Sequence, residues 1–119
     1  GATIAVVSSN GEEAIRQVMG PELVAHISHF ACGAALFGKA AVFRKVIRKA
    51  GSTPERTLCI GDEVRDIEAA REDSCGCGAV TWGFATPTIL AASGPDHLYE
   101  TPCEIARCIA PTVPAIQRA

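Results

Sequence analysis

Hydrophobic and polar residues alternate along this chain with a period that switches repeatedly between two values. Short runs rich in β-branched residues predict strands, and longer segments with apolar residues three and four positions apart predict amphipathic helices. The predicted strands cover residues 3–7, 30–32, 57–60, 79–82 and 97–99. The predicted helices cover residues 12–19, 23–29, 39–50, 64–71, 87–92 and 104–109. Strands and helices are therefore expected to alternate.

The segment 39–50 has the clearest helical pattern. Phe43, Val46 and Ile47 lie on one stripe, basic side chains occupy the opposite face, and Gly51 follows at the usual position for a helix stop. Helices placed between strands imply right-handed crossovers and a mostly parallel sheet covered on both faces. The expected fold is an α/β domain with three layers.

Size and charge narrow the possible functions. A chain of 119 residues with 48% hydrophobic residues is long enough for one domain with a core, and we assign residues 1–110 to it and 111–119 to a C-terminal tail. The net charge of −2 argues against nucleic-acid binding and against attachment to an anionic membrane. No apolar stretch approaches the roughly 18 residues of a membrane span. We expect a cytoplasmic protein whose partners are small molecules or proteins.

The cysteines are expected to be reduced and structural. Most of them lie within apolar segments, where a free thiol acts as a small hydrophobic group. Cys75 and Cys77 form the pair that best fits a metal or redox site, but their spacing is C-x-C and no second pair stands at zinc-finger spacing. His26 and His29 share a helical spacing, and a third ligand for a metal is missing. The six cysteines are Cys32, Cys59, Cys75, Cys77, Cys103 and Cys108.

Polar residues follow predicted strands or open a predicted helix at three points of the chain. Because ligands of parallel sheets bind at the carboxyl ends of strands, these residues are expected to meet at one edge. Hydroxyl and N–H groups, a lysine and paired carboxylates suit phosphoryl transfer with Mg²⁺, which prefers oxygen ligands. The candidates are Ser8, Ser9 and Asn10 for phosphate, Lys39 for phosphate at the start of its helix, and Asp62 and Asp66 for the metal.

Each of these features also has a purely structural interpretation. Ser8 and Ser9 would serve equally well as an N-cap, and Lys39 as a surface lysine. A helix cap and a surface charge would account for the two aspartates. Trp82 is most simply an aromatic residue at the end of a strand. Only the combination of the three features favours a phosphoryl site.

The motifs VVSSN, GK, CIGDEVRD, IEAAR and AVTWGF, in this order, resemble the later motifs of haloacid dehalogenase (HAD)-like phosphatases, especially the phosphoglycolate phosphatase-like branch. The resemblance covers about residues 3–100 and implies a Rossmann-like core. It implies that Ser8 and Lys39 are catalytic residues that hold the phosphoryl group, and that Asp62 and Asp66 bind Mg²⁺. The implied substrate is a small phosphorylated metabolite.

The chain departs from this family at its beginning. Members start with a strand that ends in Asp-x-Asp and lies between the second-motif and fourth-motif strands, but no aspartate precedes Asp62 here. We therefore expect a partial core that lacks the nucleophile strand and the cap domain and is inactive by itself. A fragment of a longer phosphatase and a variant completed by a partner strand both remain open. Ser74 stands where relatives often have a glycine, so the turn there is expected to differ or to tolerate a left-handed backbone.

A function of another class is a noncatalytic phosphate-binding or assembly module. Unfilled strand edges favour dimerisation, so a homodimer is a possible outcome. A receiver-like or flavodoxin-like domain would need an acidic pocket or a flavin loop early in the chain, and neither is visible.

Overall fold

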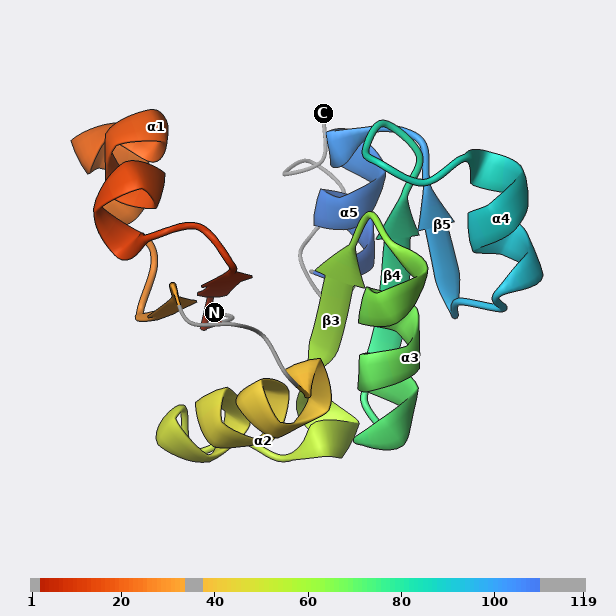
Figure 1. Ribbon diagram of the computed structural model, residues 1–119, viewed down its shortest axis with the longest axis horizontal. Helices are drawn as coiled ribbons and strands as arrows, with labels where there is room; N and C mark the ends of the chain where they lie inside the picture. The colour runs from red at the N-terminus through yellow and green to blue at the C-terminus, as the bar shows by residue number, and fades with distance from the viewer. Residues whose placement is uncertain (1–2, 34–37, 110–119) are drawn as a thin grey trace.

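The computed structural model describes residues 3–33 and 38–109 (Figure 1). Strands and helices alternate as predicted, and the tail at 111–119 lies outside the described residues. The strands are β1 (Ala5–Ser8), β2 (His29–Cys32), β3 (Leu58–Gly61), β4 (Gly76–Val80) and β5 (His97–Tyr99). The helices are α1 (Glu12–Val24), α2 (Lys39–Lys49), α3 (Val64–Glu72), α4 (Pro87–Ala92) and α5 (Pro102–Ile109), with a 3₁₀ turn at Pro54–Arg56.

The predicted helix at 23–29 is wrong. Helix α1 continues to Val24 through a kink at Gly20, whose φ of 81° is outside the helical range and whose successor is a proline. The Ser28 N–H then donates to the Ile4 carbonyl at 2.8 Å, so the chain is already beside β1. His29 is consequently the first residue of β2 rather than part of a helix.

The predicted strand at 79–82 starts too late and ends too late. Strand β4 covers Gly76–Val80, and two of its five residues are glycines, which have low strand propensity. A Cβ atom on Gly78 would lie 2.5 Å from Cε2 of Tyr99, a ring that is 3% exposed. The glycine is therefore explained by the close approach of a neighbouring aromatic ring, which local propensity does not report.

The strands form two parallel sheets. Strand β1 pairs with β2, in register from Ala5 opposite His29 to Ser8 opposite Cys32. The second sheet has the order β3-β4-β5, and its strands are also parallel. Within the described residues, β1 and β3 are not hydrogen-bonded to each other, so each has one edge without a strand partner. The expected fold class, an α/β core with parallel strands and a missing central strand, agrees with this arrangement.

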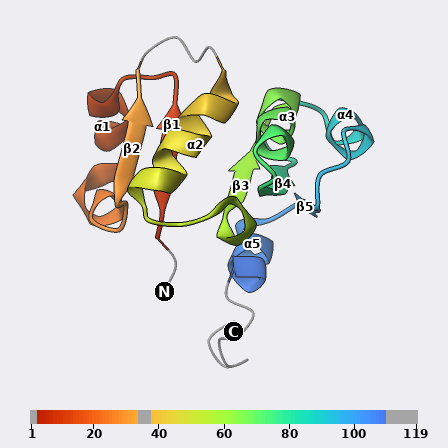
Figure 2. The ribbon, with the colours of Figure 1, turned by 90° about the horizontal axis from the view of Figure 1, so that it is seen from below.

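Helix α2 joins the two sheets. Ala40 and Phe43 of α2 pack with Ala69 of α3, and Val7 of β1 and Cys59 of β3 lie against this cluster. Figure 2 shows α2 between the β1-β2 pair and β3. A second cluster, between α3 and its sheet, includes the nearly inaccessible Ile67 and Leu90. Burial of apolar surface by α2 is therefore a main link between the halves of the molecule.

Ser74 adopts the left-handed backbone that its position requires. It follows the C-cap of α3 at a φ of 59°, and the Cys75 N–H returns to the Ala70 carbonyl at 2.9 Å. The turn has the geometry of a glycine-ended helix and tolerates a serine. Along the described ranges, no helix is both long enough and apolar enough to cross a membrane.

Candidate functional site

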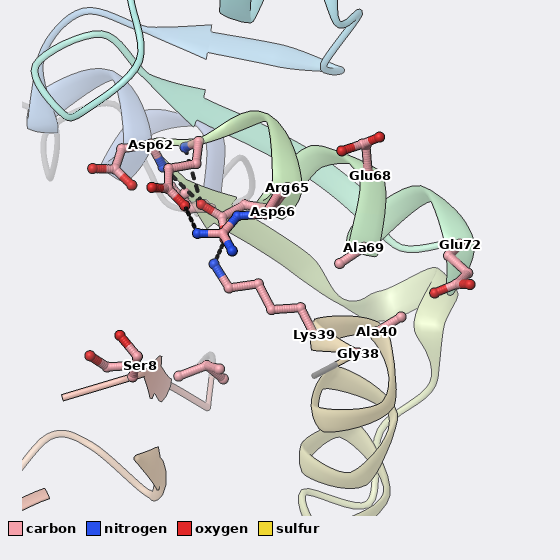
Figure 3. A pocket seen from close by; sticks show the side chains of 15 residues that line it. Ser8, Gly38, Lys39, Ala40, Asp62, Arg65, Asp66, Glu68, Ala69 and Glu72 are labelled. Atoms are coloured by element: carbon pink, nitrogen blue, oxygen red, sulfur yellow. Dashed lines mark hydrogen bonds and ion pairs between the residues drawn. The ribbon is translucent and has the colours of Figure 1, made fainter. Parts of the chain in front are cut away.

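An open groove of about 930 Å³ lies between the end of β1, the start of α2 and the β3–α3 connection (Figure 3). Five of the six candidate residues line it: Ser8, Ser9, Lys39, Asp62 and Asp66. Asn10 is not among its lining residues. The features that the sequence spreads over many residues are thus brought to one groove, because β1 and β3 both end there.

Lys39 and Asp66 form an ion pair in this groove. Lys39 is the first residue of α2, where a cation is unfavourable for the helix dipole, and its Nζ contacts Oδ1 of Asp66. The Lys39 and Asp66 side chains are only 20% and 13% exposed. Figure 3 shows Lys39 extending from α2 toward Asp66, with Ser8 on the other side of the groove. The carboxylate offsets the lysine charge and orients its amine.

The other oxygen of Asp66 organises the start of α3. Oδ2 accepts the N–H groups of Asp62 and Glu63 at 3.2 and 3.1 Å, and Glu63 is the N-cap of α3. These are backbone donors that a helix leaves unpaired at its N-terminus. A Cβ atom on Gly61 would lie 2.2 Å from Oδ2 of Asp66, which explains the glycine that ends β3.

Asp62 is oriented by the loop that follows β4. Its Oδ2 accepts the Phe84 N–H at 3.0 Å, and its carbonyl accepts the Ala85 N–H at 3.0 Å. A Cβ atom on Gly83 would lie 2.1 Å from the Asp62 Cβ, so only glycine allows this contact. Sequence reasoning missed Gly83 and noted only Trp82, which is 50% exposed in a turn beyond β4. The glycine between two aromatic residues in WGF was the available signal.

Ser8 does not cap the helix that follows it. The N-cap of α1 is Gly11, which makes no side-chain capping bond, so the N-cap interpretation of Ser8 and Ser9 is wrong. Oγ of Ser8 accepts the Asn10 N–H at 3.1 Å, and the Asn10 carbonyl accepts the Gly33 N–H at 2.8 Å. Asn10 therefore contributes its backbone to the turn beside the groove.

The carboxylates of the groove could supply some of the ligands of a magnesium ion. Both oxygens of Asp66 are engaged, whereas Oδ1 of Asp62 accepts no hydrogen bond from the described residues. Mg²⁺ is usually held by one or two carboxylates together with water and substrate oxygens. In the described part of the chain no three His, Cys, Asp or Glu side chains gather as a metal cluster. Asp62 is consequently the carboxylate here that best fits a metal ligand, and further ligands would have to come from elsewhere.

The thiols near the sheet are free and mostly protected. Cys75 and Cys77 are buried, Cys59 is partly buried, and burial raises the pKa of the Cys59 and Cys75 thiols. Burial also raises the pKa of Cys77 to about 11. Neutral thiols at physiological pH are poor nucleophiles and poor metal ligands, so this group suits a structural role.

Comparisons with known proteins agree with this geometry. Residues 1–80 match the model of the family described as haloacid dehalogenase-like hydrolase. The chain is 31% identical to a phosphoglycolate phosphatase from Synechococcus elongatus over 89% of its own length and 50% of that protein. A 56-residue segment is 36% identical to phosphoglycolate phosphatase from Salmonella typhi and spans 22% of it. The chain thus spans half or less of these relatives.

Solved structures of the same family share the fold. A predicted phosphoglycolate phosphatase from Haemophilus somnus superposes with a TM-score of 0.76 at 25% identity, over 95% of this chain and 51% of that one. The cobalt-bound deoxy-D-mannose-octulosonate 8-phosphate phosphatase from Haemophilus influenzae gives a TM-score of 0.70 at 24% identity, over 92% and 60%. The chain therefore belongs to the haloacid dehalogenase-like hydrolases, in the phosphoglycolate phosphatase-like branch.

Proposed function

We propose that this chain is the larger part of the catalytic core of a Mg²⁺-dependent phosphatase that hydrolyses a small phosphomonoester such as phosphoglycolate. The observation that carries the proposal is the single groove that Ser8, Lys39 and Asp62 all line. A hydroxyl, an ammonium group and a metal-binding carboxylate are the groups that phosphoryl transfer requires around the phosphorus atom. Phosphoglycolate phosphatases among the relatives support this substrate class.

The groove also provides a place for the missing nucleophile. The edges of β1 and β3 have no strand partner among the described residues, and Val7, Ala40 and Ile60 line the space near them. An extended segment pairing there would satisfy free backbone groups on both edges. We propose that a strand carrying the nucleophilic aspartate occupies this position, supplied by an upstream part of the same protein or by a partner. The 119-residue chain alone is then expected to be inactive.

The residues of this chain would hold the phosphoryl group and its charge. The Ser8 hydroxyl donates to one phosphoryl oxygen, and the Lys39 amine, oriented by Asp66, donates to another. Asp62 would hold Mg²⁺, which supplies charge neutralisation at the phosphoryl oxygens when bound. Asp66 then acts mainly on Lys39, and its contribution to metal binding is indirect.

The test compares the 119-residue chain with a protein extended by the reading frame upstream of Gly1. We expect Mg²⁺-dependent hydrolysis of phosphoglycolate by the extended protein only, and its loss in Lys39→Met and Asp62→Asn variants. Glu55→Ala, which removes an exposed carboxylate from the 3₁₀ turn outside the groove lining, is the matched control. Robust activity of the 119-residue chain would refute the proposal that its catalytic core is incomplete. Inactivity of an extended protein that contains Asp-x-Asp would refute the phosphatase function.

A second candidate is the noncatalytic phosphate-binding or assembly module. Within the described ranges β1 and β3 each have an edge without a strand partner, which favours this function because two copies of the chain could pair strands there. Sedimentation of the 119-residue chain, with and without inorganic phosphate, tests this function. A strict monomer with no phosphate affinity would exclude it.

A further inference from the structure

Two ion pairs join α2 to α3 at separate points along the helices. One is the Lys39–Asp66 pair in the groove. The other joins Arg44 Nη1 to Oδ1 of Asp73 at 2.6 Å. Asp73 is the C-cap of α3, so this second contact lies at the opposite end of that helix from Asp66. In Figure 1 the beginning of α2 lies near α3, and the two helices cross rather than run parallel.

The environment of Asp73 makes the second pair unusual. Asp73 is the charged residue that the described core buries, and its side chain is 1% exposed, whereas that of Arg44 is 52% exposed. Its second oxygen, Oδ2, is buried without a hydrogen-bond partner in the described residues. A buried carboxylate is strongly destabilising when its cation is removed. The Asp73 carboxylate is therefore shielded from water, and Arg44 is the cation that compensates its charge.

The apolar contact between α2 and α3 contains few buried side chains. Ala40 of α2 and Ala69 of α3 are small and let the helix backbones approach closely, and Phe43 is the large side chain in this contact. Small side chains form low ridges that interlock less than large ones, so this contact alone fixes the crossing of the two helices less tightly. A directional contact between charged groups discriminates among such positions better than apolar area does.

We propose that Arg44 is a positioning residue, whose contact with Asp73 fixes the placement of α2 against α3 and so holds the Lys39 amine at Asp66. Arg44 lies five positions after Lys39 in one helix, and helices of this length are stiff, so a shift at Arg44 moves Lys39 by a similar amount. The role of Lys39 as a phosphate ligand rests on the proposed function. The coupling between the two ion pairs is independent of that function.

The experiment measures acylation of single lysines in the 119-residue chain by limiting acetic anhydride, quantified by peptide mass spectrometry. Lys45 and Lys49 lie exposed on the same helix and are internal standards. In the unmodified chain Lys39 is expected to react more slowly than both, because it is mostly covered and ion-paired. In Arg44→Ala its rate is expected to rise until the three lysines react alike.

Three further variants separate positioning from simple loss of stability. Arg48→Ala removes an exposed arginine from the same helix and should leave the rate of Lys39 unchanged. Arg44→Lys keeps a cation for Asp73 and should restore part of the protection. Arg44→Met with Asp73→Asn leaves no uncompensated buried charge, so we expect the chain to stay folded by far-UV circular dichroism and Lys39 to lose its protection. Unchanged protection of Lys39 in this folded double variant would overturn the proposal, whatever the outcome of the phosphatase assay.

Discussion

Replacement of Asp66 by alanine tests whether the groove is organised by this carboxylate. The change removes the acceptor of the Asp62 and Glu63 N–H groups and the anion that faces Lys39. Asp66→Asn keeps a carbonyl oxygen for the N–H groups but removes the charge. Glu68→Ala, which removes an exposed carboxylate two positions further along the same helix, is the matched control.

The structure gives the expected size of the effect. Each of the two N–H bonds to the carboxylate contributes about 1.5 kcal/mol, the lower end for charged acceptors, because the groove is open to water. The ion pair with Lys39 adds about 0.5 kcal/mol, since both side chains retain some exposure. Asp66→Ala should therefore lower the free energy of unfolding by about 3.5 kcal/mol, and Asp66→Asn by about half as much. Glu68→Ala should stay within about 0.5 kcal/mol.

Urea unfolding followed by far-UV circular dichroism measures these differences. If Asp66→Ala leaves too little folded protein, the unfolding free energies of Asp66→Asn and Glu68→Ala are compared instead, and a smaller difference in the same direction is expected. Equal unfolding free energies for the Asp66 and Glu68 variants would refute the inference that Asp66 holds the groove together.

Three other changes test separate parts of the structure. Ser74→Gly should raise the free energy of unfolding by about 0.5–1 kcal/mol in urea titrations, because it relieves a φ of 59°; a loss would contradict that backbone. Gly78→Ala should lower it by about 1–3 kcal/mol through collision with Tyr99, and Tyr99→Leu should reduce that loss. Burial raises the pKa of the Cys77 thiol from 9.0 in the unfolded chain to about 11 in the folded one. The folded state therefore keeps its full stability at pH values below 9.0 and loses stability as the pH rises from there toward about 11, because the unfolded thiol ionises first. Thermal unfolding across this range should show the decline, and Cys77→Ala should flatten it; identical profiles would exclude the assignment.

The order of secondary structure could be predicted from the sequence because hydrophobic periodicity is a local property. The helix at 87–92 and the strand at 97–99 have the bounds that their patterns indicate, and α2 begins at Lys39 as expected. The motifs that mark the family are also short and contiguous, so their residues could be named before any contact was known.

Only the tertiary structure decided how these residues meet. The Lys39–Asp66 pair joins positions 27 residues apart, and Gly83 reaches Asp62 only after β4 has paired with β3. The extent of β4 depends on the packing of Gly78 under Tyr99, which overrides the low strand propensity of glycine. Local sequence determined which elements form and which chemical groups they carry. Strand pairing and close packing, which depend on segments distant in the chain, decided that these groups share one groove. Among the residues that the structure describes, they also leave β1 and β3 each with an unpaired edge beside it.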